Sequence, residues 1–175
     1  MAQNSFQHKI LSEAEFKKIA SFIERNVGIK MPIEKKLMMQ SRLNSRLKAL
    51  KMESFKEYID YIFSGKNTDD HELIMLIDAM TTNLTEFFRE PQHFDYLRNV
   101  VLPEYAKQGR TSVKIWSAGC STGQEPYTLA IVLSEFIRQN SSMLRGFYVL
   151  ATDVSKQVLV KASVAVYDML AVAAI

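Results

Sequence analysis

The sequence predicts an α/β chain in which a small all-α N-terminal domain precedes the first part of a domain of parallel strands and helices. Two observations support this prediction. Over the first 80 residues, apolar side chains recur at helical intervals between clear start and stop signals. After residue 111, a strand pattern, a glycine-containing turn, a helical pattern and a second strand pattern follow one another, as in a strand-helix-strand unit. We therefore expect domains at residues 1–80 and 112–175, joined by a connecting segment and helix at 81–111.

Amphipathic helices are expected throughout the first domain. Two capping-box pairs, Ser12 with Glu15 and Ser54 with Glu57, mark the starts of the first and third helices. A proline at the first helical position marks the start of the second, and glycine is the typical residue after a helix end. The expected boundaries are Ser12 to Gly28, Pro32 to Leu50, Ser54 to Ser64-Gly65, and Leu73 to Met80, which together describe a small helical bundle.

Basic charge is concentrated in the first domain. Residues 1–70 carry 13 Lys and Arg against 9 Asp and Glu, and between residues 30 and 56 eight basic residues meet two acidic ones. On the second expected helix, Lys35, Arg42 and Arg46 fall within an arc of about 40° beside the leucine face. Three interpretations remain open for this face: solvation alone, docking to an acidic protein surface, or contact with nucleic acid phosphates. We favour protein docking and expect no nucleic acid partner, because interleaved aromatic residues and a nucleic-acid motif are missing.

Composition and single residues argue against several other classes of protein. With 47% hydrophobic and 23% charged residues among 175, the chain has the composition of a soluble globular protein. No run approaches the roughly 20 apolar residues of a membrane span, and the first residues lack the apolar stretch of a signal peptide, so we expect a cytoplasmic protein without membrane insertion. The lone Cys120 has no partner for an intramolecular disulfide, which fits a reducing compartment. The three histidines lack the spacing of metal ligands, so we expect no metal.

The stretch IWSAGCSTGQEPYTLA, residues 115–130, predicts a strand-to-helix turn that admits a ligand. Gly119 and Gly123 permit tight backbone angles and close approach, and the amides at the start of the following helix face whatever lies above them. A strand is expected at 113–117, a helix at 125–137 and a second strand at 147–152, after which Asp153 can accept both hydroxyls of a ribose. These spacings favour a nucleoside-bearing ligand, although the glycines do not form G-x-G-x-x-G and a purely structural turn remains open. Cys120 is interpreted as a small filler of the turn, because no nearby histidine would raise its thiolate fraction.

Three segments in this order resemble one family. TTNLTEFFREPQHF at 81–94, IWSAGCSTGQEPYTLAIVL at 115–133 and VLATDVS at 149–155 are similar to the chemotaxis receptor methyltransferases of the CheR family. The resemblance implies a Rossmann-like S-adenosylmethionine-dependent methyltransferase domain, methylation of glutamate side chains on the cytoplasmic helical domain of chemotaxis receptors, and S-adenosylhomocysteine as the product. Gln124 replaces the more usual acid of the second segment. The residues that the resemblance and the turn together assign to the cofactor are Asn83, Thr85, Arg89, Gly119, Glu125 and Asp153.

The chemistry of the implied cofactor suits these residue types. Asp153 can take the ribose diol, Glu125 the ammonium or nearby hydroxyls, and Arg89 the carboxylate through a bidentate pair. The alternative for Arg89 is a structural ion pair with Glu86 or Glu90. We expect no catalytic residue, because an acceptor glutamate with an ordinary pKa of about 4.3 is already ionised at neutral pH and needs no general base. The resemblance also implies that Lys35, Arg42 and Arg46 dock the receptor.

Two rival functions remain open. A nicotinamide or other nucleotide-dependent enzyme shares the strand-turn-helix-strand order but leaves the segment at 81–94 unexplained. A non-catalytic receptor-docking or nucleotide-binding regulatory protein would keep the helical domain and part of the pocket. Only two strands are recognisable, at 113–117 and 147–152, whereas a doubly wound domain needs several. Residues 169–175 carry no charge, as expected of a segment cut from a buried context. We therefore expect the 175-residue chain alone to be inactive or nearly so.

Overall fold

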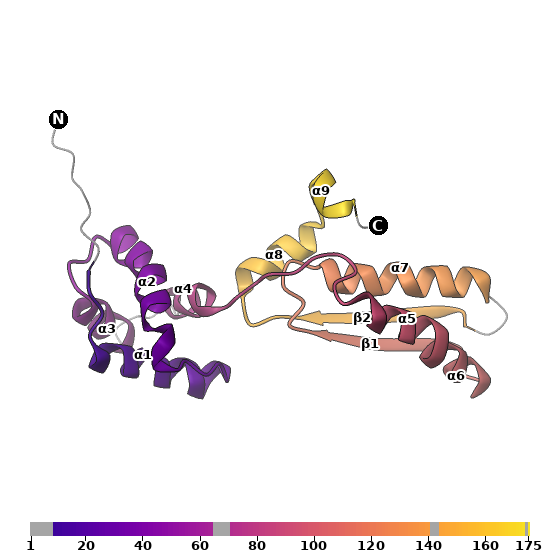
Figure 1. The fold of residues 1–175 in the computed structure, drawn as a ribbon, viewed down its shortest axis with the longest axis horizontal. Helices are drawn as coiled ribbons and strands as arrows, with labels where there is room; N and C mark the ends of the chain where they lie inside the picture. The colour runs from indigo at the N-terminus through magenta and orange to yellow at the C-terminus, as the bar shows by residue number, and fades with distance from the viewer. Residues whose placement is uncertain (1–8, 65–70, 141–143, 174) are drawn as a thin grey trace. The chain divides into compact units, whose positions relative to one another are not determined.

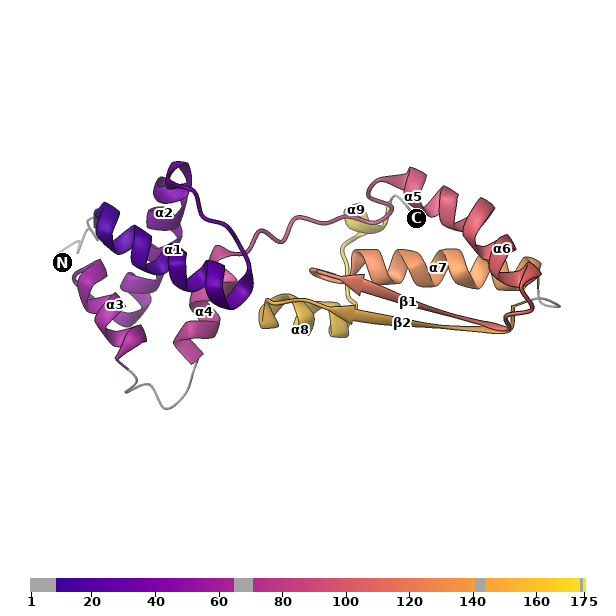
Figure 2. The same ribbon diagram turned by 90° about the horizontal axis from the view of Figure 1, so that it is seen from below.

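The computed structural model describes residues 9–64, 71–140, 144–173 and 175, and it divides into two compact units. The first unit ends at Thr81 and the second covers Thr82–Ile175. Figures 1 and 2 show the first as helical and the second as a mixture of helices and parallel strands. The expected order, an all-α domain followed by an α/β domain, is confirmed. Gly65, expected beside the end of the third helix, lies outside the described residues.

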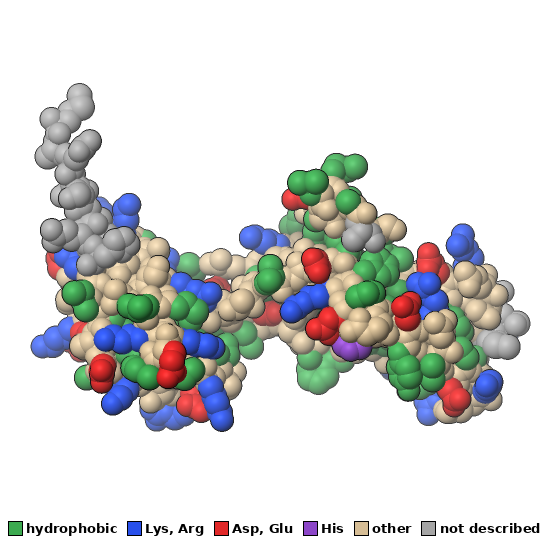
Figure 3. All heavy atoms as spheres, viewed as in Figure 1, with side chains coloured by type: hydrophobic (Ala, Val, Ile, Leu, Met, Phe, Trp, Pro, Cys, Tyr) green, Lys and Arg blue, Asp and Glu red, His purple; other side chains and the backbone are tan. Residues whose placement is uncertain are grey.

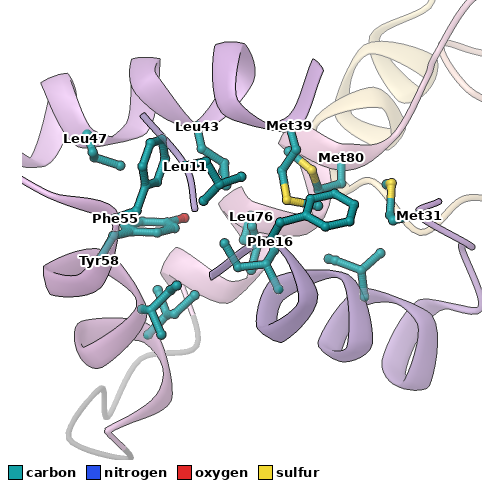
Figure 4. Close-up of a cluster of buried hydrophobic side chains, with 14 residues drawn as sticks. Leu11, Phe16, Met31, Met39, Leu43, Leu47, Phe55, Tyr58, Leu76 and Met80 are labelled. Atoms are coloured by element: carbon teal, nitrogen blue, oxygen red, sulfur yellow. The ribbon is translucent and has the colours of Figure 1, made fainter. Parts of the chain in front are cut away.

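The first unit is a bundle of amphipathic helices. Its described elements are α1 (Glu13–Val27), the 3₁₀ turn η1 (Ile33–Lys35), α2 (Lys36–Leu50), α3 (Phe55–Phe63) and α4 (His71–Met80). Apolar side chains from all four α-helices form one buried core, in which Tyr58 and Leu43 are fully enclosed. Figure 4 shows Phe16 of α1, Met39 of α2 and Leu76 of α4 as members of this one cluster. Burying these faces against one another is what holds helices of this length, since short helices are marginal in isolation.

The helix ends follow the sequence signals with two variations. Pro32, expected at the first helical position, has an extended backbone before the 3₁₀ turn η1, and α2 itself begins at Lys36. Ser12 and Glu15 form the complete reciprocal capping box of α1, and Gly28 ends that helix in the left-handed conformation with φ 75°. At α3 the Ser54 side chain accepts the Glu57 backbone N–H, but the Glu57 carboxylate accepts the N–H of the preceding residue, Glu53, at 2.9 Å. In this second capping box, the Glu57 carboxylate therefore binds the N–H of the residue before the N-cap and not that of the N-cap Ser54.

The second unit contains a parallel pair of strands with helices between and around them. Its described elements are α5 (Pro91–Tyr96), the π-helical turn η2 (Leu97–Val101), α6 (Leu102–Lys107), β1 (Ser112–Ala118), α7 (Gln124–Gln139), β2 (Gly146–Thr152), α8 (Lys156–Val164) and α9 (Met169–Val172). β1 and β2 pair in parallel from Ser112↔Gly146 to Ala118↔Thr152. α7 is the crossover helix between them, so the turn that precedes α7 lies at the carboxyl ends of both strands.

Helices cover one face of this two-stranded sheet. Val113 packs against Leu133 and Phe136 of α7 and against Leu102 of α6. On the opposite face of the sheet, large side chains from both strands are exposed in the described chain. The exposed fraction is 65% for Trp116, 59% for Tyr148 and 44% for Leu150. Because a doubly wound sheet carries helices on both faces, the described residues build one half of such a layered domain.

Candidate functional site

The turn between β1 and α7 has an unusual backbone. Gly119 has φ 80°, Ser121 φ 49° and Gly123 φ 100°, so three of five successive residues adopt left-handed conformations. Glycine does this freely, whereas Ser121 needs the surrounding structure to hold it. The Ser121 N–H donates to the Asp153 carboxylate at 2.8 Å, and its hydroxyl donates to the Asn83 carbonyl at 2.9 Å. Ser121 therefore joins the turn to the end of β2 and to the segment that begins the second unit.

Most amides of the turn already have acceptors within the protein. The N–H groups of Gly119 and Cys120 both donate to the Thr152 carbonyl, at 2.8 and 2.9 Å, and Gly123 donates to the Cys120 carbonyl at 3.0 Å. Together with the Ser121 N–H, four amides are occupied. Phosphate-binding glycine turns depend on amides that point freely at the ligand. This turn favours a ligand that approaches the backbone closely without bringing a pyrophosphate, which argues against a dinucleotide.

The two motif glycines have different roles. A Cβ added to Gly123 would lie 2.6 Å from the Tyr167 hydroxyl and 3.0 Å from the Ala162 Cβ, so protein packing requires glycine there. A Cβ added to Gly119 would have no atom within 4 Å. Gly119 is also exposed at the carboxyl end of β1. Gly119 is therefore the position at which a ligand can come close to the backbone.

Asp153 lies where the sequence places it, directly after β2, and its carboxylate ties two elements together. Oδ2 accepts the Ser121 N–H at 2.8 Å and Oδ1 accepts the Ser155 N–H at 2.9 Å. Asp153 is half-buried, and each carboxylate oxygen has a second lone pair. The residue can therefore hold the turn and still accept two hydroxyls from a ligand.

Glu125 lies in the first turn of α7, beside the same edge of the sheet. Its Oε1 accepts the hydroxyl of Ser117 at 2.6 Å, and Ser117 is itself buried on β1. The rest of the Glu125 side chain is exposed. A carboxylate anchored through one oxygen and open on the other is suited to receive an ammonium or a hydroxyl.

The segment before α5 is fastened to this site by main-chain contacts. The Asn83 carbonyl accepts the Ser121 hydroxyl, and the Phe88 N–H donates to Thr128 Oγ1 of α7 at 3.2 Å. Thr85, between these two anchors, is half-buried. Arg89 is exposed, and its Nη1 donates to the Leu84 carbonyl at 3.3 Å.

No ion pair joins Arg89 to Glu86 or Glu90 within the described residues, so the structural alternative for Arg89 is not seen. Instead, the Glu90 carboxylate oxygen Oε2 lies 3.2 Å from Nδ1 of His93. The Arg89 guanidinium is therefore available to a carboxylate from solution.

Cys120 is buried inside the turn, with 1% of its surface exposed. Its thiol lies 3.7 Å from the Ser121 carbonyl. Burial raises the pKa of the Cys120 thiol, and the carboxylates of Asp153 and Glu125 raise it further. A buried thiol held protonated supports the interpretation of Cys120 as a filler rather than a nucleophile.

The three basic residues predicted to dock a partner differ in how far their side chains are free. Lys35 is exposed, but Arg42 Nη1 donates to the Ala79 and Thr81 carbonyls, at 3.1 and 2.9 Å. These carbonyls lie at the end of α4, where a cation complements the helix dipole. In Figure 3 other Lys and Arg side chains are spread over the visible face of this unit among hydrophobic ones.

Arg46 is engaged inside the bundle. Its Nε and Nη2 donate to both oxygens of Glu72, at 3.0 and 2.6 Å, and Tyr58 donates to the same carboxylate at 2.9 Å. The hydrogen bond to Glu72 raises the pKa of Arg46, and burial raises that of Tyr58. Because the arc beside the leucine face also faces α4, both arginines serve the bundle itself. A docking role for them stays a prediction.

The described residues contain no group of His, Cys, Asp and Glu arranged to hold a metal ion. No described helix is long and apolar enough to cross a membrane.

Several contributors to the site were not singled out from the sequence. Ser117 orients Glu125, Ser121 joins three segments, and Thr128 anchors the Phe88 amide. Tyr167, far along the chain, donates to the Thr122 carbonyl at 2.7 Å. The one feature that all four share is a side-chain hydroxyl, which alone is too common to predict a role.

Two family models match the chain. Residues 83–175 match the CheR methyltransferase SAM-binding domain, and residues 14–81 match the CheR methyltransferase all-alpha domain. The chain is 39% identical over 170 residues to a chemotaxis protein methyltransferase of Borreliella burgdorferi, covering 94% of this chain and 59% of that protein. It is 36% identical to chemotaxis protein methyltransferase 1 of Pseudomonas aeruginosa, covering 91% and 58%, and 35% identical to the Salmonella typhimurium enzyme, covering 93% and 53%.

The chain thus spans between half and three-fifths of the length of these curated relatives. The matched SAM-binding domain indicates S-adenosylmethionine as the cofactor, and the open Gly119, the two acidic side chains and the occupied turn amides fit a nucleoside ligand that has no phosphate. Both matched domains occur in the expected order, and together they cover most of the sequence. The chain belongs to the CheR methyltransferase family.

Proposed function

We propose that the protein transfers the methyl group of S-adenosylmethionine to glutamate side chains of chemotaxis receptors, which yields glutamyl methyl esters and S-adenosylhomocysteine. The observation that carries the proposal is the edge of the sheet at the carboxyl ends of β1 and β2. There Gly119 is open, Asp153 and Glu125 each present carboxylate oxygen, and four amides of the turn donate to acceptors within the protein. Membership of the CheR family supports the same assignment.

Each cofactor group has a residue of matching chemistry in this unit. Asp153 would accept the ribose hydroxyls, Glu125 the ammonium or a hydroxyl, and Arg89 would pair with the carboxylate. Asn83 and Thr85 belong to the segment that Ser121 fastens over the turn. When bound, the cofactor supplies an electrophilic methyl group on a sulfonium.

The protein's task in catalysis is positioning. An acceptor glutamate with an ordinary pKa of about 4.3 is ionised at neutral pH, so no general base has to remove a proton. The segment 82–88 and the turn instead hold their ligand at a fixed place, and orientation can supply most of the rate. Cys120, the one thiol of the chain, is buried and protonated and takes no part.

The proposed partner is the cytoplasmic helical domain of a chemotaxis receptor, which places the protein in the cytoplasm. The positively charged first unit would face the acidic flank of that domain. Among the three residues predicted for docking, Lys35 is the one whose charge is exposed. Arg42 and Arg46 would contribute through those parts of their guanidinium groups that α4 leaves accessible.

Calorimetry with S-adenosylhomocysteine, together with transfer of labelled methyl from S-adenosylmethionine to a receptor cytoplasmic domain, tests the proposal. The label should be released by mild base, as expected of an ester, and a receptor with Gln at the acceptor positions should take up none. NAD should not bind. Binding of NAD in preference to S-adenosylhomocysteine would contradict the proposal.

A non-catalytic docking protein is the second candidate, and the uncovered sheet face is the observation that favours it. Trp116, Tyr148 and Leu150 are exposed where a complete methyltransferase sheet would be covered. If this candidate is correct, the 175-residue chain binds the receptor but transfers little or no methyl. Robust transfer by the 175-residue chain would remove this candidate.

A further inference from the structure

Tyr167 lies outside the segments that define the cofactor site, yet its side chain contacts two of them, the segment before α5 and the glycine turn with the start of α7. It follows α8 by three residues, after Ala165 reverses the chain in the left-handed conformation with φ 56°. This reversal brings the Tyr167 ring back over the start of α7. The residue is half-buried and does not lie at the open Gly119.

The hydroxyl of Tyr167 fixes the second half of the glycine turn. It donates to the Thr122 carbonyl at 2.7 Å, and it lies 2.6 Å from the place that a Cβ on Gly123 would take. Burial and the neighbouring Tyr127 and Cys120 raise the pKa of Tyr167, so the hydroxyl keeps the proton it donates. Thr122 is the residue after Ser121, whose N–H reaches Asp153.

The ring of Tyr167 contacts the other two parts of the site. Phe87 packs against it edge-on, with centroids 5.0 Å apart and planes at 80°. Phe87 is buried and stands between Thr85 and Arg89 in the sequence. Tyr127 of α7 packs against the same ring at 6.1 Å and 73°. Edge-on aromatic contacts of this kind favour one relative orientation.

We propose that Tyr167 is a positioning residue for the cofactor site, which locks the glycine turn, the segment 82–88 and the start of α7 in the arrangement that binds S-adenosylmethionine. It acts through Thr122 and Phe87 and does not itself touch the cofactor. The proposal rests on the proposed function, because positioning matters only if these segments bind that ligand together.

Tyr167→Phe is the test, because it keeps the ring and removes only the hydroxyl. Tyr127→Phe is the matched control: it removes a similar hydrogen bond, from the Tyr127 hydroxyl to the Ala162 carbonyl at 2.9 Å, which joins α7 to α8 without reaching the turn. We expect both variants to lower the thermal midpoint of unfolding. Only Tyr167→Phe should also weaken S-adenosylhomocysteine binding, by about fivefold, the effect of losing one ordinary hydrogen bond. Equal losses of affinity in the two variants, or unchanged affinity in Tyr167→Phe, would overturn the proposal.

Cys120 provides a second measurement that needs no cofactor. It is the chain's single cysteine, buried in the turn, so its rate of reaction with a disulfide reagent reports opening of the turn. We expect Tyr167→Phe to raise this rate about fivefold and Tyr127→Phe to leave it near the wild-type value. If the Cys120 reaction rate is the same in Tyr167→Phe as in the wild type, the Tyr167 hydroxyl does not hold the turn closed and the proposal is overturned. If the wild-type protein does not bind S-adenosylhomocysteine, the proposed function fails, and the cysteine rates still decide whether Tyr167 holds the turn.

Discussion

Replacing Asp153 with Asn separates the structural role of this carboxylate from its proposed role in binding. Oδ1 and Oδ2 each accept one backbone N–H, from Ser155 and Ser121. Asparagine has the same shape but only one acceptor oxygen, and its amide nitrogen is a donor. In either orientation of the amide, one of the two backbone N–H groups must face another donor.

Two different losses follow from this geometry. Leaving one buried N–H without an acceptor costs about 1 to 3 kcal/mol of folding stability. Losing the charged acceptor of a ribose hydroxyl costs about 1.5 to 3 kcal/mol of binding free energy, which corresponds to roughly 10- to 150-fold in the dissociation constant. Asp153→Asn should therefore lower both stability and affinity.

Urea denaturation and calorimetry with S-adenosylhomocysteine measure the two losses separately. Ser155→Ala is the control, because it removes the side-chain cap of α8 and so weakens the same connection, by about 1 kcal/mol, without changing the Asp153 carboxylate. If Asp153→Asn loses stability but keeps wild-type affinity, the ribose assignment is wrong. If Ser155→Ala loses as much affinity as Asp153→Asn, weakening of the β2–α8 connection explains the result instead.

Three further substitutions test other parts of the structure. Arg46→Met should destabilise the protein by about 3 to 5 kcal/mol in urea denaturation, because it leaves the carboxylate of Glu72, 4% exposed, without its cationic partner; a loss under about 1 kcal/mol would show that the pair is dispensable. Gly123→Ala should lower the thermal midpoint of unfolding far more than Gly119→Ala does, and the reverse ranking would refute the packing argument. Gly119→Ala should instead weaken S-adenosylhomocysteine binding, and it should cost folding only the roughly 1 to 3 kcal/mol of a left-handed alanine. Lys35→Glu should weaken receptor binding at low salt and leave stability unchanged, and an affinity that is the same for wild type and variant at every salt concentration would exclude Lys35 from docking.

The helical bundle was predictable because its signals are local. The Ser12 capping box, the Gly28 terminator and the apolar repeats each depend on residues within a few positions of one another, and the structure has α1 to α4 where these signals place them. The shifted capping interaction at Glu57 shows the limit of such signals. Spacing identifies the helix start, but not which backbone N–H the carboxylate accepts.

The partners of the arginines were not predictable in the same way. Helical geometry places Arg42 and Arg46 on one arc, but it does not say which other helix packs beside that arc. Glu72 is 26 residues from Arg46, and nothing in the pattern around it distinguishes a buried acid from a solvated one. Replacing both Arg42 and Arg46 with Glu would place a second carboxylate, at position 46, beside the buried Glu72. A docking experiment based on that reversal would therefore report unfolding of the bundle, which is why the exposed Lys35 is the better test.

The two motif glycines show what the sequence leaves out at the site. The sequence indicates conformational freedom at both positions. In the structure, glycine is required at position 123 because Tyr167 and Ala162 leave no room for a Cβ, and of the two only Gly119 is open to a ligand. Tyr167 lies 44 positions beyond Gly123, between two helices, with no motif to mark it. Contacts of this range depend on the course of the chain after α8, and local spacing does not encode that course.

The acceptors of the turn amides distinguish this site from a nucleotide-phosphate site more clearly than the glycines do. A strand-turn-helix unit that binds pyrophosphate needs free N–H groups at the turn, because the ligand's charge is what they hold. Here the Thr152 carbonyl and the Asp153 carboxylate, both from the end of β2, take up the N–H groups of Gly119, Cys120 and Ser121. The same contacts that fasten the turn to the second strand therefore leave these three N–H groups unavailable to a phosphate. Side chains are available to hold a ligand at this edge, and the cation of S-adenosylmethionine is suited to an edge where Glu125 and Asp153 place two carboxylates.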